Sequence, residues 1–368
     1  MTNHVDRRFK AGISLRAALS GVLAAATAGC TILGVASHTA PAKGWPSPVT
    51  AATYDGHQWL RGRPAARYSY LGTGRQNIGF NLIDCPAAGT CFAAGLAVRH
   101  TDGRLVTGLV ARFAHSNWSV TKRLPGDPED PKTLSCADVS SCFIAGSSAM
   151  YVLDGISWKR DQQLPYGPGR VACGAPDFCI AVGVAAYQYR TFYRGAWSTP
   201  RAIPAVPPMN LLPKLLSCAG PTFCLGMTYG TYWTFDGKTF TPSRAQAFPL
   251  GSHWMDETAI SCASPSFCMA VGGNSQGGMA SVYNGHAWST PVQVAQRLGF
   301  TQLTSVSCPT PSFCVATGTW SGPTREFALI FNSGRWSSPA PIANVEGDPS
   351  VSCPSDTYCL ALTGEVSS

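Results

Sequence analysis

Charged side chains are scarce in this sequence: Asp, Glu, Lys and Arg together make up 12% of its 368 residues. Ordinary globular proteins carry about twice that share, so the composition argues against a disordered chain or a coiled coil. The 27 Lys and Arg residues form no long basic run, which removes the footprint expected of a nucleic-acid-binding protein. Long helices are also disfavoured, because 38 Gly and 28 Pro interrupt the chain.

The motifs of several enzyme classes are missing too. HExxH, Gly-x-Ser-x-Gly and a Gly-rich phosphate loop do not occur. The segment Asp127-Pro128-Glu129-Asp130 has too few ligands for a defined Ca²⁺ site and is interpreted as a solvated turn. We therefore expect no cofactor, no metal site and no nucleic-acid partner.

The N-terminal segment is built like an export signal. Four bases stand against one acid in residues 1–16, and residues 17–35 are uncharged and apolar. A basic segment before an apolar one is typical of a secretory signal, although a retained membrane anchor is the alternative. We expect residues 1–42 to form a signal and linker and residues 43–368 to form the folded domain.

Two processing schemes compete at this end of the chain. Ala40-Pro41-Ala42 fits a small-x-small cleavage site and would release a soluble protein. Thr27-Ala28-Gly29-Cys30 resembles a bacterial lipobox, with Thr27 where Leu is usual, and would place a lipid on Cys30. The protein is then secreted in the first case and membrane-attached at the cell surface in the second.

Cysteine is the residue with a pattern. Apart from Cys30, the 14 remaining cysteines form seven C-x5-C pairs whose first members are separated by 51, 37, 45, 44, 46 and 45 residues. The pairs are Cys85/Cys91, Cys136/Cys142, Cys173/Cys179, Cys218/Cys224, Cys262/Cys268, Cys308/Cys314 and Cys353/Cys359. Such regular spacing is an internal repeat of about 45 residues.

Other residues repeat with the cysteines. Ser precedes the first Cys in five units, at Ser135, Ser217, Ser261, Ser307 and Ser352. An aromatic residue precedes the second Cys in five units, at Phe178, Phe223, Phe267, Phe313 and Tyr358. An aromatic-Gly-Trp cluster follows about 15 to 20 residues later, as in Tyr283-Asn284-Gly285-His286-Ala287-Trp288. Each unit is therefore a complete structural module.

One unit predicts four short strands separated by Pro/Ser or Asn/Gly turns. In the sixth unit these strands are 303–308, 313–319, 326–331 and 335–342. Seven four-stranded units predict an all-β, seven-bladed β-propeller. Only nine residues follow Cys359, whereas Tyr54-Asp55-Gly56-His57-Gln58-Trp59 precedes every Cys pair, so residues near 45–65 should complete the last blade and close the ring.

Each C-x5-C pair is expected to form a disulfide across the turn between the first two strands of its blade. Zinc is the alternative, but structural zinc takes four ligands and seven pairs do not divide into four-cysteine sites. Fifteen cysteines in all also favour an oxidising compartment outside the cytoplasm.

The Gly-Trp cluster resembles the Asp-box of sialidase-type propellers, best at Asp55-Gly56-His57-Gln58-Trp59 and Asp236-Gly237-Lys238-Thr239-Phe240. Both lack the residue between Asp and Gly, and Phe240 replaces the Trp. Residues 45–368, with their repeated Ser-Cys and Phe-Cys units, look like the secreted BNR-like propellers of high-GC Gram-positive bacteria. That resemblance implies the fold and leaves the activity open.

Propeller ligands usually bind on the face that carries the loops between strands two and three and the links between blades. The residues of those segments are our candidate binding residues: Arg75, Arg99, His100, Tyr187, Tyr189, Arg190, Tyr229, His253, Trp254, Asp256, Glu257, Trp320 and Arg325. The spacing of 51 residues also predicts an extended loop in the first blade. Aromatic and charged side chains on one rim suit a glycan or a protein ligand.

These observations predict an exported, monomeric binding or scaffold propeller at the cell surface, with no catalytic residue indicated. A sialidase-like glycoside hydrolase or lyase at the channel mouth is the alternative. It would need three Arg and an acid to converge there. Asp256 and Glu257 are the only paired acids on the rim, and neighbouring residues of a strand point to opposite faces.

Overall fold

The computed structural model describes the chain in segments, all of which belong to the second of two units, 1–45 and 46–368. The described residues are 49–64, 76–99, 104–119, 122–126, 129–161, 164, 169–183, 187–204, 213–243, 247–248, 255–295, 301–320, 326–342 and 348–363. They contain 31 strands, and no helix occurs among them.

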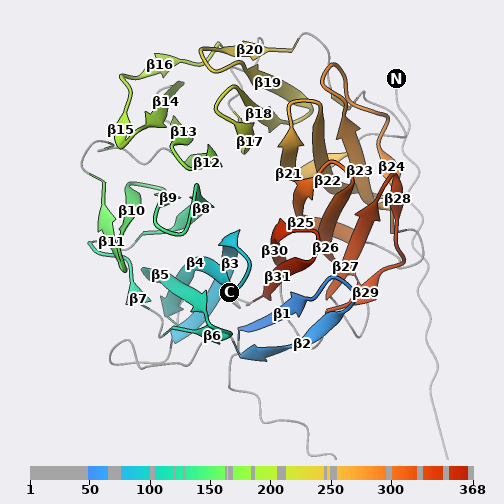
Figure 1. Cartoon of the computed structure of the whole chain (residues 1–368), viewed down its shortest axis with the longest axis horizontal. Coiled ribbons are helices and arrows are strands. Elements are labelled where there is room, and N and C mark those ends of the chain that lie inside the picture. Colours follow the sequence, from blue (N-terminus) through green and yellow to red (C-terminus); the bar gives the residue numbers. More distant parts are fainter. Residues whose placement is uncertain are drawn as a thin grey trace, which may run out of the picture. The chain divides into compact units, whose positions relative to one another are not determined.

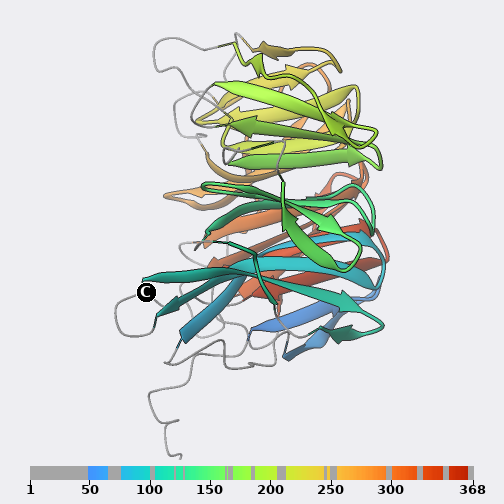
Figure 2. The same cartoon turned by 90° about the vertical axis from the view of Figure 1, so that its left-hand side faces the viewer.

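The strands form seven antiparallel sheets that follow one another around a ring, as the sequence predicts (Figure 1). Each sheet is a blade that runs from an inner strand next to the central axis to an outer strand at the rim. Seen from the side, neighbouring blades lie face to face (Figure 2). We number the blades from the Cys85/Cys91 unit, so that blade 7 contains Cys353 and Cys359.

The first three blades use β3 to β16. Blade 1 contains β3 (Gln76–Ala87), β4 (Thr90–Arg99), β5 (Leu105–Ala114), β6 (Asn117–Trp118) and β7 (Lys122–Arg123). Blade 2 contains β8 (Pro131–Cys136), β9 (Cys142–Gly146), β10 (Met150–Asp154) and β11 (Ser157–Arg160). Blade 3 contains β12 (Arg170–Ala175), β13 (Phe178–Gly183), β14 (Gln188–Tyr193), β15 (Ala196–Trp197) and β16 (Arg201–Ala202).

The next three blades repeat the same order. Blade 4 contains β17 (Leu215–Gly220), β18 (Phe223–Thr228), β19 (Thr231–Phe235) and β20 (Phe240–Pro242). Blade 5 contains β21 (Asp256–Ser264), β22 (Phe267–Asn274), β23 (Gly277–Tyr283) and β24 (Val292–Gln293). Blade 6 contains β25 (Thr301–Thr310), β26 (Phe313–Trp320), β27 (Glu326–Asn332), β28 (Arg335–Trp336) and β29 (Ala340–Pro341).

Blade 7 joins the two ends of the domain. Its inner strands are β30 (Ser350–Ser355) and β31 (Tyr358–Thr363), and its outer strands are β1 (Thr50–Tyr54) and β2 (Trp59–Pro64). β1 pairs with β31 over five residues, from Thr50–Thr363 to Tyr54–Cys359. The predicted ring closure is therefore confirmed, and it leaves no open seam between the first and last repeats.

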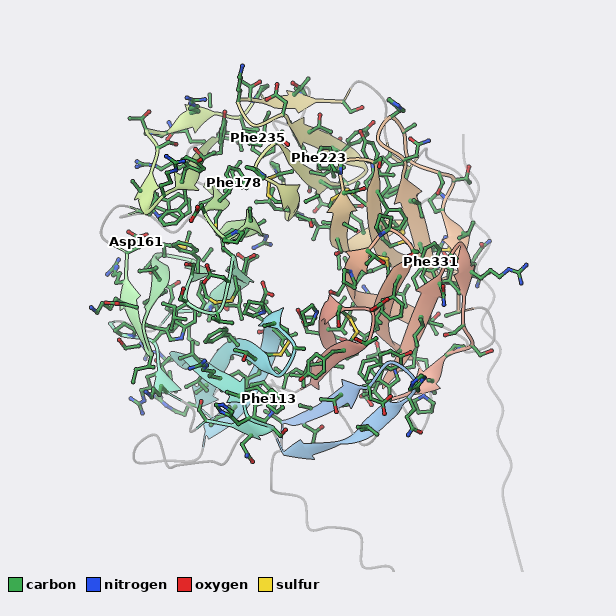
Figure 3. The ribbon with its side chains drawn as sticks, in the orientation of Figure 1. Phe113, Asp161, Phe178, Phe223, Phe235 and Phe331 are labelled. Carbon is green, nitrogen blue, oxygen red and sulfur yellow. A yellow bond between two sulfur atoms is a disulfide. The ribbon has the colours of Figure 1, made fainter. Side chains whose placement is uncertain are left out.

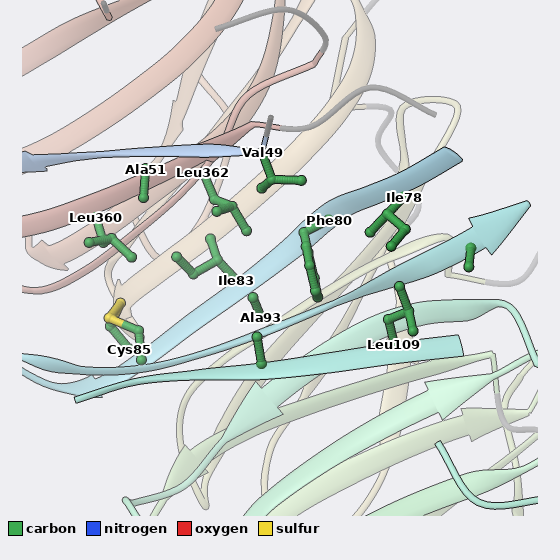
Figure 4. Packing of buried hydrophobic residues seen from close by; sticks show 13 residues of the cluster. Val49, Ala51, Ile78, Phe80, Ile83, Cys85, Ala93, Leu109, Leu360 and Leu362 are labelled. Atoms are coloured by element: carbon green, nitrogen blue, oxygen red, sulfur yellow. A yellow bond between two sulfur atoms is a disulfide. The ribbon is translucent and has the colours of Figure 1, made fainter. Parts of the chain in front are cut away.

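The closing strands also share a hydrophobic core with blade 1. Val49 and Ala51 pack with Leu360 and Leu362 of β31 and with Phe80 of β3 (Figure 4). Each of these side chains is at most 7% exposed. Burial of this apolar surface stabilises the joint between the first and last repeats.

All seven predicted disulfides are present, with Cα–Cα distances of 3.9 to 4.1 Å. Each one joins the first and second strands of a blade next to their connecting turn, and several are visible on the inner part of the ring (Figure 3). The bonds are Cys85–Cys91, Cys136–Cys142, Cys173–Cys179, Cys218–Cys224, Cys262–Cys268, Cys308–Cys314 and Cys353–Cys359.

The second cysteine of every pair is completely buried. Its exposed fraction is 0% in each blade, at Cys91, Cys142, Cys179, Cys224, Cys268, Cys314 and Cys359. These residues belong to the hydrophobic clusters between and within blades, as Cys91 does beside Leu109 and Cys268 does beside Met279. The disulfides are therefore structural cross-links, and the second cysteine of each offers no surface to a ligand.

The two ends of the ring differ in what they carry. The disulfides and the aromatic-Gly-Trp turns lie at the same end of each blade. We call this end of the ring the turn face and the opposite end, where the inner strands begin, the loop face.

The Ser before the first Cys links neighbouring blades. Ser217 Oγ accepts a hydrogen bond of 2.9 Å from the backbone N–H of Cys262 in the next blade. Equivalent bonds run from Cys85 to Ser352, from Cys173 to Ser135, from Cys308 to Ser261 and from Cys353 to Ser307. In blade 1 the Ser is replaced by Asp84, whose Oδ2 accepts from Cys136 N–H at 2.9 Å. The repeated Ser therefore satisfies an inner-strand donor that the strand's own sheet leaves open.

The repeated aromatic residues make a second link between blades. Phe223, which precedes the second Cys of blade 4, stacks on Tyr283 of blade 5 with ring centroids 6.3 Å apart. Tyr283 in turn packs on Trp288 across its own turn at 5.5 Å. The same pairing joins Phe178 to Phe235 (both labelled in Figure 3), Phe267 to Phe331 and Phe313 to Tyr54. The aromatic-Gly-Trp cluster is thus a packing device.

The turn in this cluster is set by Asx hydrogen bonds. Asp55 Oδ1 accepts from the N–H groups of His57 and Gln58 at 2.9 Å, and Gly56 follows with a φ of 92°. These bonds hold the pKa of Asp55 below its ordinary value. Asp236 and Asn284 make the same pair of bonds in blades 4 and 5.

The length of blade 1 has a different origin from the one predicted. We expected its 51-residue spacing to lengthen a loop, but β4 and β5 each have 10 residues, whereas β9 and β10 of blade 2 each have five. The additional residues extend an antiparallel hairpin. Pairing satisfies their backbone donors and acceptors better than a long loop would.

Candidate binding surface on the loop face

The inner strands bring their first residues to the loop face. Arg170 is the first residue of β12 and pairs with Val182, while Cys173 and Cys179 pair towards the other end of the same two strands. Lys214 occupies the comparable place just before β17, where its N–H donates to Met227 O at 2.9 Å. The side chains of neighbouring blades therefore meet around the axis at this end.

Three residues of blades 3 and 4 are joined by direct contacts. Arg170 Nε donates a hydrogen bond to the backbone oxygen of Lys214. The Lys214 ammonium lies 3.9 Å from the centroid of the Tyr229 ring and donates to the Tyr229 hydroxyl. A cation over an aromatic face is electrostatically favourable, so Tyr229 holds the Lys214 side chain in place.

Blade 5 adds a carboxylate beside this group. Glu257 Oε1 accepts a hydrogen bond of 3.2 Å from the N–H of Gly230, the residue after Tyr229. Burial raises the pKa of Glu257 above its ordinary value, and the nearby charge of Asp256 adds to the effect. Asp256 itself is exposed, as expected for consecutive strand residues on opposite faces. We call Arg170, Lys214, Tyr229 and Glu257 the polar cluster.

Two tyrosines project from this face on neighbouring blades. Tyr187 and Tyr229 occupy the loops between the second and third strands of blades 3 and 4, and they are 44% and 56% exposed. Both have left-handed backbone conformations, with φ of 49° and 47°. That conformation costs a non-glycine residue roughly 1–2 kcal/mol, so the surrounding loops must impose it.

Two of the predicted binding residues, Tyr189 and Arg190, lie in a strand and not in a loop of the loop face. Tyr189 is 2% exposed, packs against Phe235 and Phe240, and donates its hydroxyl to Lys238 O at 2.8 Å. Arg190 lies within β14 and pairs with Ala181, so it belongs to a third strand and not to a loop. We expected Tyr189 and Arg190 to lie in a loop at the rim. The structure corrects this prediction, because β14 begins at Gln188 and includes both residues.

Two more candidates lie at loop-face ends of strands away from the polar cluster. Arg99 is the last residue of β4, and its N–H donates to Arg104 O at 2.8 Å. Trp320 ends β26 and stacks on Phe327 of β27 with ring centroids 5.1 Å apart. The structure therefore brings together Tyr229 and Glu257 from the predicted set and leaves Arg99 and Trp320 on blades 1 and 6.

The remaining predicted residues lie outside the described segments. They are Arg75, His100, His253, Trp254 and Arg325, together with the lipidation candidate Cys30.

Buried acids elsewhere have structural partners. Glu129, which we expected in a solvated turn, is instead 2% exposed and accepts hydrogen bonds from Ser148 N–H at 2.9 Å and from the Ser148 hydroxyl. Asp161 accepts from Trp197 Nε1 at 2.8 Å (Asp161 is labelled in Figure 3). Across the described segments, no three His, Cys, Asp or Glu side chains are grouped as metal ligands would be. The same segments include no helix that has the length and apolarity to cross a bilayer.

Sequence reasoning missed Arg170 and Lys214. A signal for them exists, because each stands three or four residues before the first Cys of its unit, at the start of an inner strand. Our search considered the loops alone, and these cations belong to strand ends. The resulting surface presents two cations, a half-buried carboxylate and exposed phenol rings, which suits a polar ligand that carries charge.

Comparisons with known proteins support the fold. No family model matches the chain, and no curated protein matches it. Among solved structures, YCF48 bound to D1 peptide is 12% identical, has a TM-score of 0.54, and is matched over 80% of this chain and 95% of its own. A catalytically inactive virginiamycin B lyase from Staphylococcus aureus with quinupristin is 8% identical, with a TM-score of 0.55 over 78% and 95%. The chain is a seven-bladed β-propeller with a disulfide in every blade.

Proposed function

We propose that the protein is an exported binding module that recognises a peptide or protein through the loop face at blades 3 to 5. The observation that carries this proposal is the polar cluster, in which Lys214 and Tyr229 of blade 4 lie beside Glu257 of blade 5. A neighbour of the same fold is bound to a peptide, which supports a ligand of this class. Charges of both signs within a few residues suit a peptide better than a neutral glycan.

Localisation forms part of the proposal. Seven disulfides are typical of an oxidising extracellular environment. With the basic and apolar N-terminal segment, they favour export of a domain that begins near residue 43, either released or held by a lipid on Cys30. Mass spectrometry of the mature N-terminus separates these two forms.

The binding proposal is tested by screening the oxidised protein against a peptide array and a glycan array. We expect retention of peptides, and we expect Tyr229→Ala to abolish it. Tyr193→Ala is the matched control, because Tyr193 is 51% exposed, lies at the turn face and also has a cation, Arg194, over its ring at 5.1 Å. Equal loss in both variants, or retention of glycans alone, would contradict the proposal.

A lyase or glycoside hydrolase at the same surface is the second candidate. Two observations favour it: the raised pKa of Glu257 suits a proton donor, and the Tyr229 hydroxyl is bonded to an ammonium group. A lyase also has a similar fold. Product analysis of every array hit separates the candidates, since breakdown of a bound compound would replace the binding module by an enzyme.

A further inference from the structure

Resting on the proposed function, we propose that Arg170 and Lys214 form a subsite for a carboxylate group of the bound peptide. The subsite lies on the loop face at the joint between blades 3 and 4. Its ligand class is therefore an acidic peptide, and the Arg170–Lys214 pair fixes where the acidic residue sits.

The Arg170 guanidinium is bonded to the backbone of Lys214 across the joint. Arg170 comes from the inner strand of blade 3 and Lys214 from the entrance to the inner strand of blade 4, and Arg170 Nε donates to Lys214 O. Arg170 Nη1 donates to Gly169 O at 2.7 Å. These two bonds fix the plane of the guanidinium before any ligand arrives, which lowers the entropic cost of binding.

Neither cation is paired with a carboxylate among the described residues. The ion pairs in the described part of the chain, such as Lys132–Asp130 and Lys159–Asp154, do not involve Arg170 or Lys214. Arg170 is half-buried, and loss of hydration lowers its pKa. A partly desolvated cation whose bonds go to carbonyl groups gains most from an incoming anion, and Arg and Lys bind carboxylates through short charge-assisted hydrogen bonds.

The joint itself departs from the repeat. Ala172 stands where most units have the Ser that bonds to the next blade, so the bond made by Ser217 to Cys262 has no counterpart from Ala172 to Cys218. The backbones approach closely instead: a Cβ on Gly174 would lie 2.7 Å from Gly220 N. Arg170 thus bridges a joint of the inner ring where neither the repeated hydroxyl nor a carboxylate such as that of Asp84 precedes the first Cys.

The groups beside the subsite indicate how a bound peptide would be oriented. Tyr229 holds the Lys214 ammonium 3.9 Å above its ring, so that ring face is not open as a platform for a sugar. Glu257 lies beside the residue after Tyr229, where it accepts a hydrogen bond from Gly230 N–H. A peptide with an acidic residue towards Arg170 and Lys214 and a basic residue towards Glu257 matches this order of charges.

The experiment uses pairs of array peptides that differ only by Asp to Asn or Glu to Gln. We expect the oxidised protein to retain the acidic member about tenfold more strongly than its amide partner. Lys214→Met should remove this preference, and Lys214→Arg should keep it. Arg170→Gln should act like Lys214→Met, with the thermal unfolding curve as the check that blades 3 and 4 stay folded.

The matched control is Lys238→Met, which removes an exposed lysine of blade 4 from the turn face and should leave the preference unchanged. Equal retention of acidic and amide peptides would overturn the carboxylate subsite while leaving the peptide-binding function in place. Retention of oligogalacturonate but of no peptide would overturn the peptide class, and retention of nothing would overturn the proposed function itself.

Discussion

The two ends of the propeller use the same residue types for different purposes. On the turn face, Tyr283 is 4% exposed, stacks between blades and donates its hydroxyl to Gly285 O at 2.9 Å. On the loop face, Tyr229 is 56% exposed and contacts Lys214. Residues that recur in most units hold the ring together, whereas the polar cluster is available for a ligand.

The largest effect should come from breaking the repeated packing. Tyr283→Ala removes contacts with Phe223, Tyr232 and Trp288 and leaves a cavity between blades 4 and 5. We expect the free energy of unfolding to fall by about 4 kcal/mol, measured by guanidinium denaturation of the oxidised protein. A loss below about 1 kcal/mol would show that the aromatic pairs do not carry the blade joints.

The joint between blades 1 and 2 should make stability depend on pH. Asp84 is enclosed by uncharged groups, namely the N–H groups of Cys85 and Cys136 and the hydroxyls of Ser135 and Ser352, and burial raises its pKa to about 6. The folded state therefore holds the proton more tightly than the unfolded chain. Its stabilising contribution is complete below about pH 4 and is lost as pH rises through about 6, a change of about 3 kcal/mol.

Asp84→Ser restores the residue that other units have at this position. We expect the variant to be more stable than the parent at pH 8 and to lack the decline between pH 4 and 6, measured by thermal unfolding across that range. The converse change, Ser261→Asp, should introduce the decline at a regular joint. An unchanged pH profile in Asp84→Ser would assign the decline to other groups.

A smaller effect is expected where the repeated hydroxyl is missing. Ala172→Ser would place an acceptor next to Cys218 N–H, in the arrangement that Ser217 and Cys262 already adopt. One added hydrogen bond should raise the free energy of unfolding by about 1 kcal/mol. A destabilised variant would mean that the close approach of Gly174 and Gly220 leaves no room for the hydroxyl.

The sequence predicted what depends on the repeat. The seven disulfides, the four-stranded blade and the closure by residues 50–64 all follow from spacing. In the sixth blade, the strands predicted over 313–319 and 326–331 correspond to β26 and β27, each of which is one residue longer. The role of the repeated Ser was missed, because its bond reaches the next blade and no local pattern reports it.

The candidate site was harder to predict, because contacts between blades leave no local pattern in the sequence. Tyr229 and Glu257 were selected as loop residues, but Arg170 and Lys214 meet them only because three consecutive blades converge around one axis. Tyr189 was placed on the rim because its neighbour Tyr187 belongs to the loop, whereas the strand begins between them and turns its ring inward. One-residue errors at a strand's start reverse which side chains are buried.

The most direct test compares Tyr229→Ala with Tyr283→Ala in two assays on the oxidised protein: the free energy of unfolding and retention of the strongest peptide hit at low temperature. We predict that Tyr229→Ala abolishes retention and changes stability by less than about 0.5 kcal/mol. Tyr283→Ala should lose about 4 kcal/mol and keep retention. Loss of retention only in Tyr283→Ala would contradict the division of labour between the two faces.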